Sequence, residues 1–194
     1  MTARGERRRR AILEATVALV GREGTAAVTH RAVAAEAGVP LAATTYYFDS
    51  KEALIREALA EAAASDEQTL ALIGPLLESA ESVAELVAAL MDLIARWLGI
   101  GRTTLIAHYE LCLEAARRPE LEELARAWTD VHVRALAPTL QRLRSPDPER
   151  DAWTLVTALD GMVIEQLAAR RPEFEGALLR PALERLLRGL LSSS

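Results

Sequence analysis

The segment from Thr29 to Glu52 constrains the fold of this chain more than any other part of the sequence. Apolar residues recur at helical spacing before and after Gly38-Val39. Thr29 is a suitable cap for a short helix, and Gly38 suits the positive φ of a tight turn. Pro40 fits the first turn of the next helix, where a missing N–H needs no partner. The segment therefore predicts a helix-turn-helix, which can place a short helix in a DNA major groove.

Helical spacing also dominates the rest of the chain, and no alternating run of β-branched or aromatic residues indicates a strand. We therefore predict an all-α protein of about nine helices. Gly74-Pro75 is the expected end of a fourth helix that Asp49 or Ser50 caps, and Pro181 is expected to kink or restart the last helix. The helices after the fourth are expected at about residues 82–99, 103–117, 119–144, 149–170 and 172–191, with a kink at Pro138 in the third of these.

Charge is unevenly distributed along the 194 residues. Up to Lys51 the chain carries eight basic and five acidic residues, whereas the remainder carries 15 basic and 23 acidic ones. The net charge of −5 argues against nucleic-acid binding by the surface as a whole. Since the basic excess lies at the end that carries the helix-turn-helix, we expect DNA to contact that end only.

Composition also restricts the compartment. With 51% hydrophobic residues the chain can bury a sizeable core, and no run approaches the roughly 18 uninterrupted apolar residues of a membrane span. The arginine-rich start is not followed by the apolar stretch of a signal peptide, so we expect a cytoplasmic protein with no membrane partner. The lone Cys112 cannot form an internal disulfide, and cysteine usage neither requires nor excludes a reducing compartment.

Between about Arg10 and Leu59 the chain contains an ordered set of motifs at fixed spacings. They are Ala11-Ile12-Leu13-Glu14-Ala15, Gly24, Thr29-x-Arg31-x-Val33-Ala34-x-x-Ala37-Gly38-Val39, Tyr46-Tyr47-Phe48 and Ser50-Lys51-x-x-Leu54. This stretch, about a quarter of the chain, resembles the DNA-binding domain of the tetracycline-repressor (TetR) family of bacterial one-component regulators. The resemblance implies a three-helix DNA-binding domain at residues 1–52 and a helical effector-binding and dimerisation domain at residues 53–194.

One departure from the family pattern follows the turn. Members often have Ser-x-Gly-Thr-Leu-Tyr there, whereas this chain reads Pro40-Leu41-Ala42-Ala43-Thr44-Thr45 before its tyrosines. The change is expected to preserve the fold and alter the recognition surface. The docking element can thus be named without naming the operator.

The expected DNA contacts lie at the ends of the short helices. A tyrosine phenol can donate to a phosphate, and the resemblance places a phosphate-contacting aromatic at Tyr47 and a backbone-contacting lysine at Lys51. A phosphate would offset the unfavourable position of that cation in the first turn of a helix. The full set is Thr29, Arg31, Thr44, Thr45, Tyr46, Tyr47 and Lys51.

Plainer interpretations of these residues stay open. The tyrosines are alternatively core aromatics, the threonines helix-face fillers and Lys51 a solvated lysine. Arg31 alternatively forms a surface ion pair with Glu36 or Glu23. The run Arg7 to Arg10 is either a basic arm along the DNA backbone or minor groove, or a solubilising terminus.

The carboxy-terminal part carries surplus apolar surface. Residues 152–168 are apolar over more than one helical face, and leucines form a stripe along the last helix. This favours a homodimer in which each protomer contributes two helices to a four-helix seam, although the same helices can pack within one chain. The expected interface residues are Leu159, Met162, Val163, Leu179, Leu183, Leu186 and Leu187.

The middle helices supply an expected effector pocket of apolar character with a few polar groups. Each member is alternatively a core or surface residue. No histidine, cysteine and carboxylate cluster has metal spacing, so we expect neither a metal nor a cofactor, only an effector whose structure the sequence does not define. The pocket residues are Trp97, His108, Tyr109, Glu110, Cys112, Trp128 and His132.

Two other classes of protein compete with a regulator. His108 and Cys112 are four residues apart on a helix, but nothing supplies an orienting group or an oxyanion hole, so no catalytic residue is expected. A helical protein-interaction module is the second rival. The sequence favours a ligand-responsive repressor that binds a near-palindromic DNA operator as a homodimer and is released by a small molecule.

Overall fold

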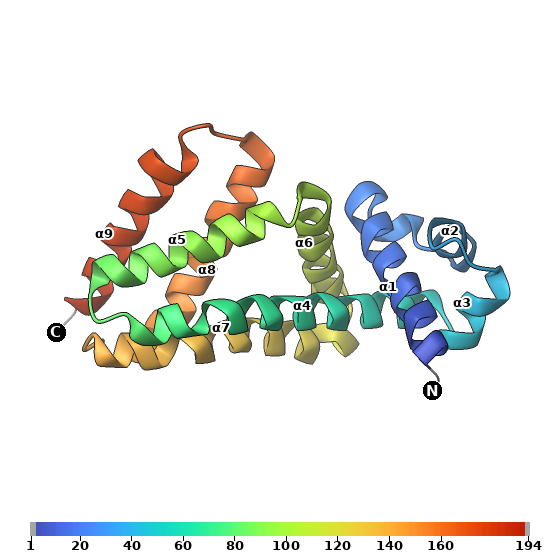
Figure 1. Ribbon diagram of the computed structural model, residues 1–194, viewed down its shortest axis with the longest axis horizontal. Helices are drawn as coiled ribbons and strands as arrows, with labels where there is room; N and C mark the ends of the chain where they lie inside the picture. Colours follow the sequence, from blue (N-terminus) through green and yellow to red (C-terminus); the bar gives the residue numbers. More distant parts are fainter. Residues whose placement is uncertain (1–2, 193–194) are drawn as a thin grey trace. The chain divides into compact units, whose positions relative to one another are not determined.

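The computed structural model describes residues 3–192, without the side chains of residues 65 and 66, and this part of the chain forms nine α-helices and no strand (Figure 1). The all-α prediction is therefore confirmed. The helices are α1 (Ala3–Glu23), α2 (His30–Glu36), α3 (Leu41–Tyr47), α4 (Lys51–Ser79), α5 (Val83–Gly99), α6 (Arg102–Arg117), α7 (Glu122–Arg142), α8 (Pro148–Ala169) and α9 (Arg180–Leu191). Short turns of other helix types are η1 (Thr25–Ala27), η2 (Pro119–Leu121) and η3 (Phe174–Leu179).

The chain divides into two compact units. The first comprises Met1–Ser65 and Ile100–Ala125, so α6 belongs with α1, α2, α3 and the first half of α4. The second comprises Asp66–Gly99 and Arg126–Ser194, which includes α5, α8 and α9. This grouping concerns packing; the division by function after residue 52 stays a prediction.

Helix α6 packs closely against α1 within the first unit. Gly21 is buried on α1, and a Cβ built there would lie 2.0 Å from the carbonyl oxygen of Thr103 on α6. Only a residue without a side chain fits this approach. Gly101, with a φ of +104°, precedes α6 and turns the chain into it.

Helix α4 differs from the sequence prediction. It does not end at Gly74 but continues through Pro75 to Ser79. Proline removes one backbone donor from the helix interior. Ile73 and Leu77 are both fully buried on either side of it, and their burial favours continuation of the helix. The predicted break was therefore wrong by about one helical turn.

The second unit is built from amphipathic helices around a leucine-rich core. On α9, Leu183 and Leu187 are fully buried, and the π-helical turn η3 buries Phe174 and Leu179. Pro181 lies in the first turn of α9, so the predicted restart is confirmed. Helix α7 continues through Pro138 to Arg142.

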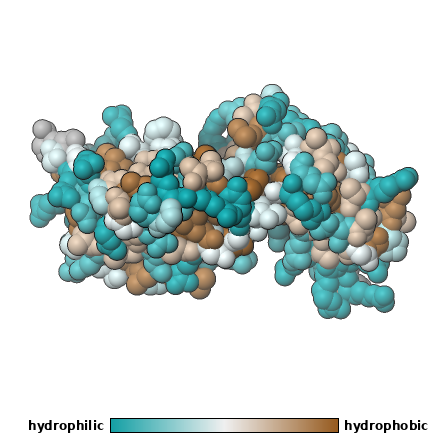
Figure 2. All heavy atoms as spheres, turned by 90° about the horizontal axis from the view of Figure 1, so that it is seen from above, coloured by the Kyte–Doolittle hydropathy of each residue, from teal (hydrophilic) through white to brown (hydrophobic). Residues whose placement is uncertain are grey.

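Apolar side chains form the interior of each unit, while hydrophilic ones dominate the face drawn in Figure 2, with apolar ones between them. Within residues 3–192, no helix combines the length and apolar character that crossing a bilayer requires.

Candidate nucleic-acid interface

The helix-turn-helix forms through local hydrogen bonds that the sequence predicts. Thr29 caps α2, since its Oγ1 accepts a hydrogen bond from the N–H of Ala32 at 3.1 Å. Gly38 has a φ of +63°, and the N–H of Val39 donates to the carbonyl of Ala34 at 3.0 Å. These contacts close the turn before α3 begins at Leu41. The predicted cap and turn are confirmed.

Thr44 fixes α3 against α2 and does not face solvent. Its side chain is fully buried, and its hydroxyl donates to the carbonyl of Leu41 at 2.8 Å and approaches the carbonyl of His30 at 3.4 Å. A hydroxyl in this position is not available to a base or a phosphate in this conformation. Its expected contact with DNA is therefore replaced by a positioning role.

The other polar residues at the end of α3 are accessible. Tyr46 is 80% exposed, and Thr45 is exposed with its hydroxyl donating to the carbonyl of Ala42 at 3.3 Å. Tyr47 is half-buried, and the two tyrosine rings meet edge to face with centroids 4.9 Å apart. The pair holds one phenol out from the surface, while Phe48 is buried in the core.

Arg31 is exposed on α2 and pairs with neither acid that the sequence offers. Arg22 instead binds both, at 3.0 Å to Glu23 and 2.9 Å to Glu36. The hydrogen bond from Arg22 is the main reason why the pKa of Glu36 is lowered. Among the described residues Arg31 has no ion-pair partner, so its guanidinium is available to an external anion.

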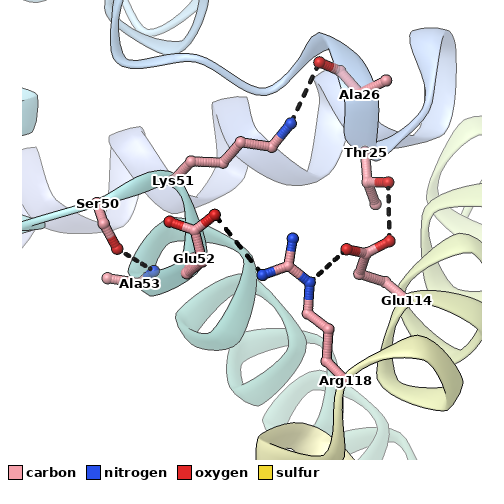
Figure 3. Close-up of polar contacts among 8 residues, drawn as sticks. All are labelled: Thr25, Ala26, Ser50, Lys51, Glu52, Ala53, Glu114 and Arg118. Carbon is pink, nitrogen blue, oxygen red and sulfur yellow. Dashed lines mark hydrogen bonds and ion pairs between the residues drawn. The ribbon is translucent and has the colours of Figure 1, made fainter.

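Lys51 begins α4 at the end nearest η1. Ser50 caps the helix by accepting from the N–H of Ala53 at 3.0 Å, and the Nζ of Lys51 donates to the carbonyl of Ala26 at 3.3 Å (Figure 3). The pKa of Glu52 is lowered, foremost by a backbone hydrogen bond at its own N–H. A carboxylate and an ammonium therefore both lie at a helix terminus that favours anions.

The amino-terminal arginines are part of α1 and not an extended arm, because α1 already begins at Ala3. Arg9 forms an ion pair with Glu57 and lies over the ring of Phe48 at 5.7 Å. Arg7 and Arg10 are exposed along the helix, and Arg8 is half-buried. The arm that the sequence suggested is therefore corrected to a basic helical segment.

A polar network that sequence reasoning missed joins α6 to the start of α4. Glu114 is buried and accepts hydrogen bonds from Arg118 and, at 3.2 Å, from Thr25, while Arg118 also lies 3.6 Å from Glu52 (Figure 3). Burial opposes ionisation of Glu114, but Arg118, Thr25 and Arg117 outweigh it, so its pKa is lowered. The i, i+4 spacing of Glu114 and Arg118 was the available sequence signal.

The expected pocket residues are distributed over both units. His108, Tyr109, Glu110 and Cys112 lie half-buried on α6, where the rings of His108 and Tyr109 meet with centroids 4.9 Å apart. The other three belong to the second unit, where Trp97, Trp128 and His132 are all buried. No group of three metal-binding side chains occurs among the residues that the structure describes.

The expected dimer residues divide by burial. Leu186 and Met162 are half-buried, whereas the others pack in the interior of one chain. A separate groove of about 570 Å³ lies between α8 and the η3–α9 segment, and its lining is mainly apolar. It includes Ala158, Gly161, Met162, Leu178 and Pro181. The five buried dimer candidates are Leu159, Val163, Leu179, Leu183 and Leu187.

Comparisons with known proteins cover both ends of the chain. A family model described as bacterial regulatory proteins of the tetR family matches residues 12–58, and one described as a tetracycline repressor-like C-terminal domain matches residues 81–193. The nicotine-responsive transcriptional repressor HdnoR of Paenarthrobacter nicotinovorans is 24% identical over 83% of this chain and 84% of its own length.

Two solved structures are similar over nearly the whole chain. A TetR-family member from Streptomyces coelicolor A3 is 36% identical, with a TM-score of 0.78 over 92% of this chain and 97% of that one. The multidrug binding protein EbrR in complex with ethidium is also 36% identical, with a TM-score of 0.74 over 92% of this chain and 98% of that one.

Proposed function

Because the chain belongs to the tetR family of bacterial regulatory proteins, and so is a ligand-responsive DNA-binding regulator and not an enzyme, we propose that it is a repressor. In this proposal a homodimer binds a near-palindromic operator in the cytoplasm, and a small molecule releases it. The exposed end of α3 beside the amino terminus of α4 is the observation that supports this mode of docking.

The proposed DNA contacts divide into base-reading and phosphate-binding residues. Tyr46 and Thr45 face solvent at the end of α3 and are placed to reach bases or sugars. Arg31, Tyr47, Lys51 and the capping residue Thr29 bind phosphates, and Lys51 exchanges the carbonyl of Ala26 for a phosphate oxygen. Thr44 supports these residues from beneath.

In the proposed function the two domains meet after residue 52, as the sequence predicts. Residues 1–52 contact DNA, and residues 53–194 bind the effector and form the dimer. Nicotine, which the name of one similar protein contains, and ethidium, which is bound in the structure of another, both contain aromatic nitrogen heterocycles. We therefore expect an aromatic effector for this chain. The candidate contacts within the second unit are Trp97, Trp128 and His132, and α6 carries a separate candidate set in the first unit.

The proposed dimer face is the groove between α8 and the η3–α9 segment. A Cβ added at Gly161 would lie in open space, and Leu178 is 41% exposed, so the apolar lining is open to a second chain. Met162 and Leu186 stay in the proposed interface, while the five buried residues support it from within. A twofold dimer sets its recognition helices about 34–36 Å apart, or one turn of DNA.

Salt-dependent DNA binding tests this function. We expect the protein to bind DNA from its own upstream intergenic region, with an affinity that falls steeply as salt rises. Lys51→Ala should weaken binding to operator and random DNA alike and flatten the slope of log affinity against log salt by about one.

The matched control is Arg150→Ala, which removes an exposed arginine from α8 in the second unit. It should leave affinity and slope unchanged. Unchanged binding by Lys51→Ala would remove the phosphate role of that residue. Absence of DNA binding by the parent at low salt would refute the proposed docking.

A further inference from the structure

Two aromatic rings meet in the interior of the second unit. Trp97 on α5 and His132 on α7 lie edge to face, with centroids 5.3 Å apart and ring planes inclined by 75°. Their exposed fractions are only 6% and 5%. Leu93, one turn before Trp97, and Leu136, one turn after His132, are buried on the same helix faces.

Hydrogen bonding defines the protonation of His132. Its Nδ1 lies 3.1 Å from the carbonyl oxygen of Trp128, and a carbonyl only accepts, so Nδ1 carries the hydrogen. Burial lowers the pKa of His132, although the bond to Trp128 opposes this, so the ring is neutral at pH 7. Its Nε2 is therefore a lone-pair acceptor.

The two remaining ring nitrogens are complementary and unsatisfied. Neither Nε2 of His132 nor Nε1 of Trp97 has a hydrogen-bond partner among the residues that the structure describes. The indole N–H only donates, and the neutral imidazole Nε2 only accepts. Leaving each buried and unpaired costs about 1–3 kcal/mol.

Other buried polar side chains of the same unit are satisfied. Thr139 donates to the carbonyl of Leu77 at 2.7 Å, and Asp151 accepts from Ser145 at 2.6 Å. The unpaired donor and acceptor are thus a local exception and occur on adjacent rings. Buried polar groups without protein partners are expected where a ligand or water completes them.

We propose that Trp97 and His132 are the polar anchor of the effector site, and that they select an aromatic molecule with one neutral group that both accepts and donates a hydrogen bond. A hydroxyl or an azole meets this requirement, whereas an ether only accepts. This inference rests on the proposed function, because it assumes that an effector binds the second unit. It adds the chemical class of that effector.

Paired probes test the anchor by calorimetry on the full chain without DNA. The pairs are phenol and anisole, β-naphthol and its methyl ether, and benzimidazole and N-methylbenzimidazole. In each pair methylation removes the donor and keeps the aromatic body. We expect the parent to bind the unmethylated member of at least one pair about tenfold or more tightly.

Trp97→Phe keeps a ring but removes the donor that both members of each pair bind, so it should weaken both members alike and leave the preference in place. His132→Phe removes the acceptor that only the unmethylated member binds, so it should reduce the preference to about twofold or less. His132→Gln places an amide near the Nε2 position and should restore part of it. Trp153→Phe is the control, since Trp153 is 55% exposed on α8. It should leave the preference unchanged.

The outcomes separate this inference from the proposed function. If no probe binds, if the parent shows no preference, if folded His132→Phe retains the preference, or if folded Trp97→Phe binds both members as tightly as the parent does, the anchor is refuted. A water that bridges the two nitrogens in place of a ligand would produce one of the first two results. Operator binding is measured separately. If the protein binds DNA but does not distinguish the methylated from the unmethylated probes, only the proposed anchor is refuted. If it distinguishes the probes but does not bind DNA, only the proposed function as a DNA-binding repressor is refuted.

Discussion

At the scale of single residues, three polar side chains of low exposure differ in what sets the balance between their charged or polar groups and burial. Thr44 is satisfied by carbonyls of its own helix pair, and Glu114 by Arg118 and Thr25. For Asp160 on α8, desolvation by burial raises the pKa of the carboxyl group from 3.8 to about 6. The first two therefore stabilise local structure, whereas ionised Asp160 opposes folding at neutral pH.

Asp160→Asn should stabilise the protein at pH 7. The folded state binds the proton of Asp160 more tightly than the unfolded state, so the parent loses stability as pH rises from 3.8 to about 6. Asparagine removes this loss, with a gain of at most ~3 kcal/mol at pH 7. Chemical denaturation at several pH values measures it.

The gain should shrink as pH falls below about 6 and vanish near 3.8. Asp151→Asn is the control on the same helix, since Ser145 donates to that carboxylate. It should not stabilise the protein at any pH. A gain for Asp160→Asn that is independent of pH would contradict the desolvation argument.

At the scale of helices, the free space around a glycine decides whether an added methyl group stabilises or destabilises the protein. Gly21→Ala should destabilise the first unit by about 1–3 kcal/mol, because its Cβ would overlap the backbone at Thr103. Gly189→Ala places a Cβ in open space within α9 and should stabilise by up to about 1 kcal/mol. Thermal unfolding by circular dichroism compares the two, and equal effects would argue against the α1–α6 approach.

Local signals explain which elements the sequence could predict. The cap at Thr29 and the turn at Gly38 depend on neighbouring residues, so their patterns were sufficient. The continuation of α4 through Pro75 depends on burial of residues on either side, which the local signal does not contain. The predicted breaks at proline were therefore reliable only where tertiary packing did not oppose them.

The DNA-binding site could likewise be predicted only where local signals were sufficient. Tyr46 is exposed and Thr44 is buried although both lie on the short helix α3, because packing decides which face of α3 meets α2. The leucine stripe of α9 predicted a buried face but not which chain buries it. Leu183 and Leu187 pack in their own protomer, so periodicity alone did not identify the outer face.

At the scale of the whole molecule, the proposed function depends on association. In that proposal one helix-turn-helix reads half of a near-palindromic operator, and a dimer joins two such contacts in one binding event. The apolar groove between α8 and the η3–α9 segment is where the described surface offers a second chain a continuous lining. Disrupting this groove should weaken DNA binding without touching a DNA contact.

Gly161→Arg is the variant that tests this coupling. Its Cβ would lie in open space, and arginine has a higher helix propensity than glycine, so the protomer should fold with a thermal stability no lower than that of the parent. A charge in the proposed interface should convert a dimer of two 21.1 kDa chains into a monomer. Light scattering after gel filtration measures the mass.

Operator affinity should fall about 100-fold or more with the loss of the second half-site contact, while the weak affinity for random DNA falls less. Leu72→Arg is the control, because Leu72 is 69% exposed on α4 and does not line the groove. It should remain dimeric and bind normally. A parent that is monomeric at micromolar concentration, or a dimeric Gly161→Arg with full operator affinity, would show that this face does not join the protomers.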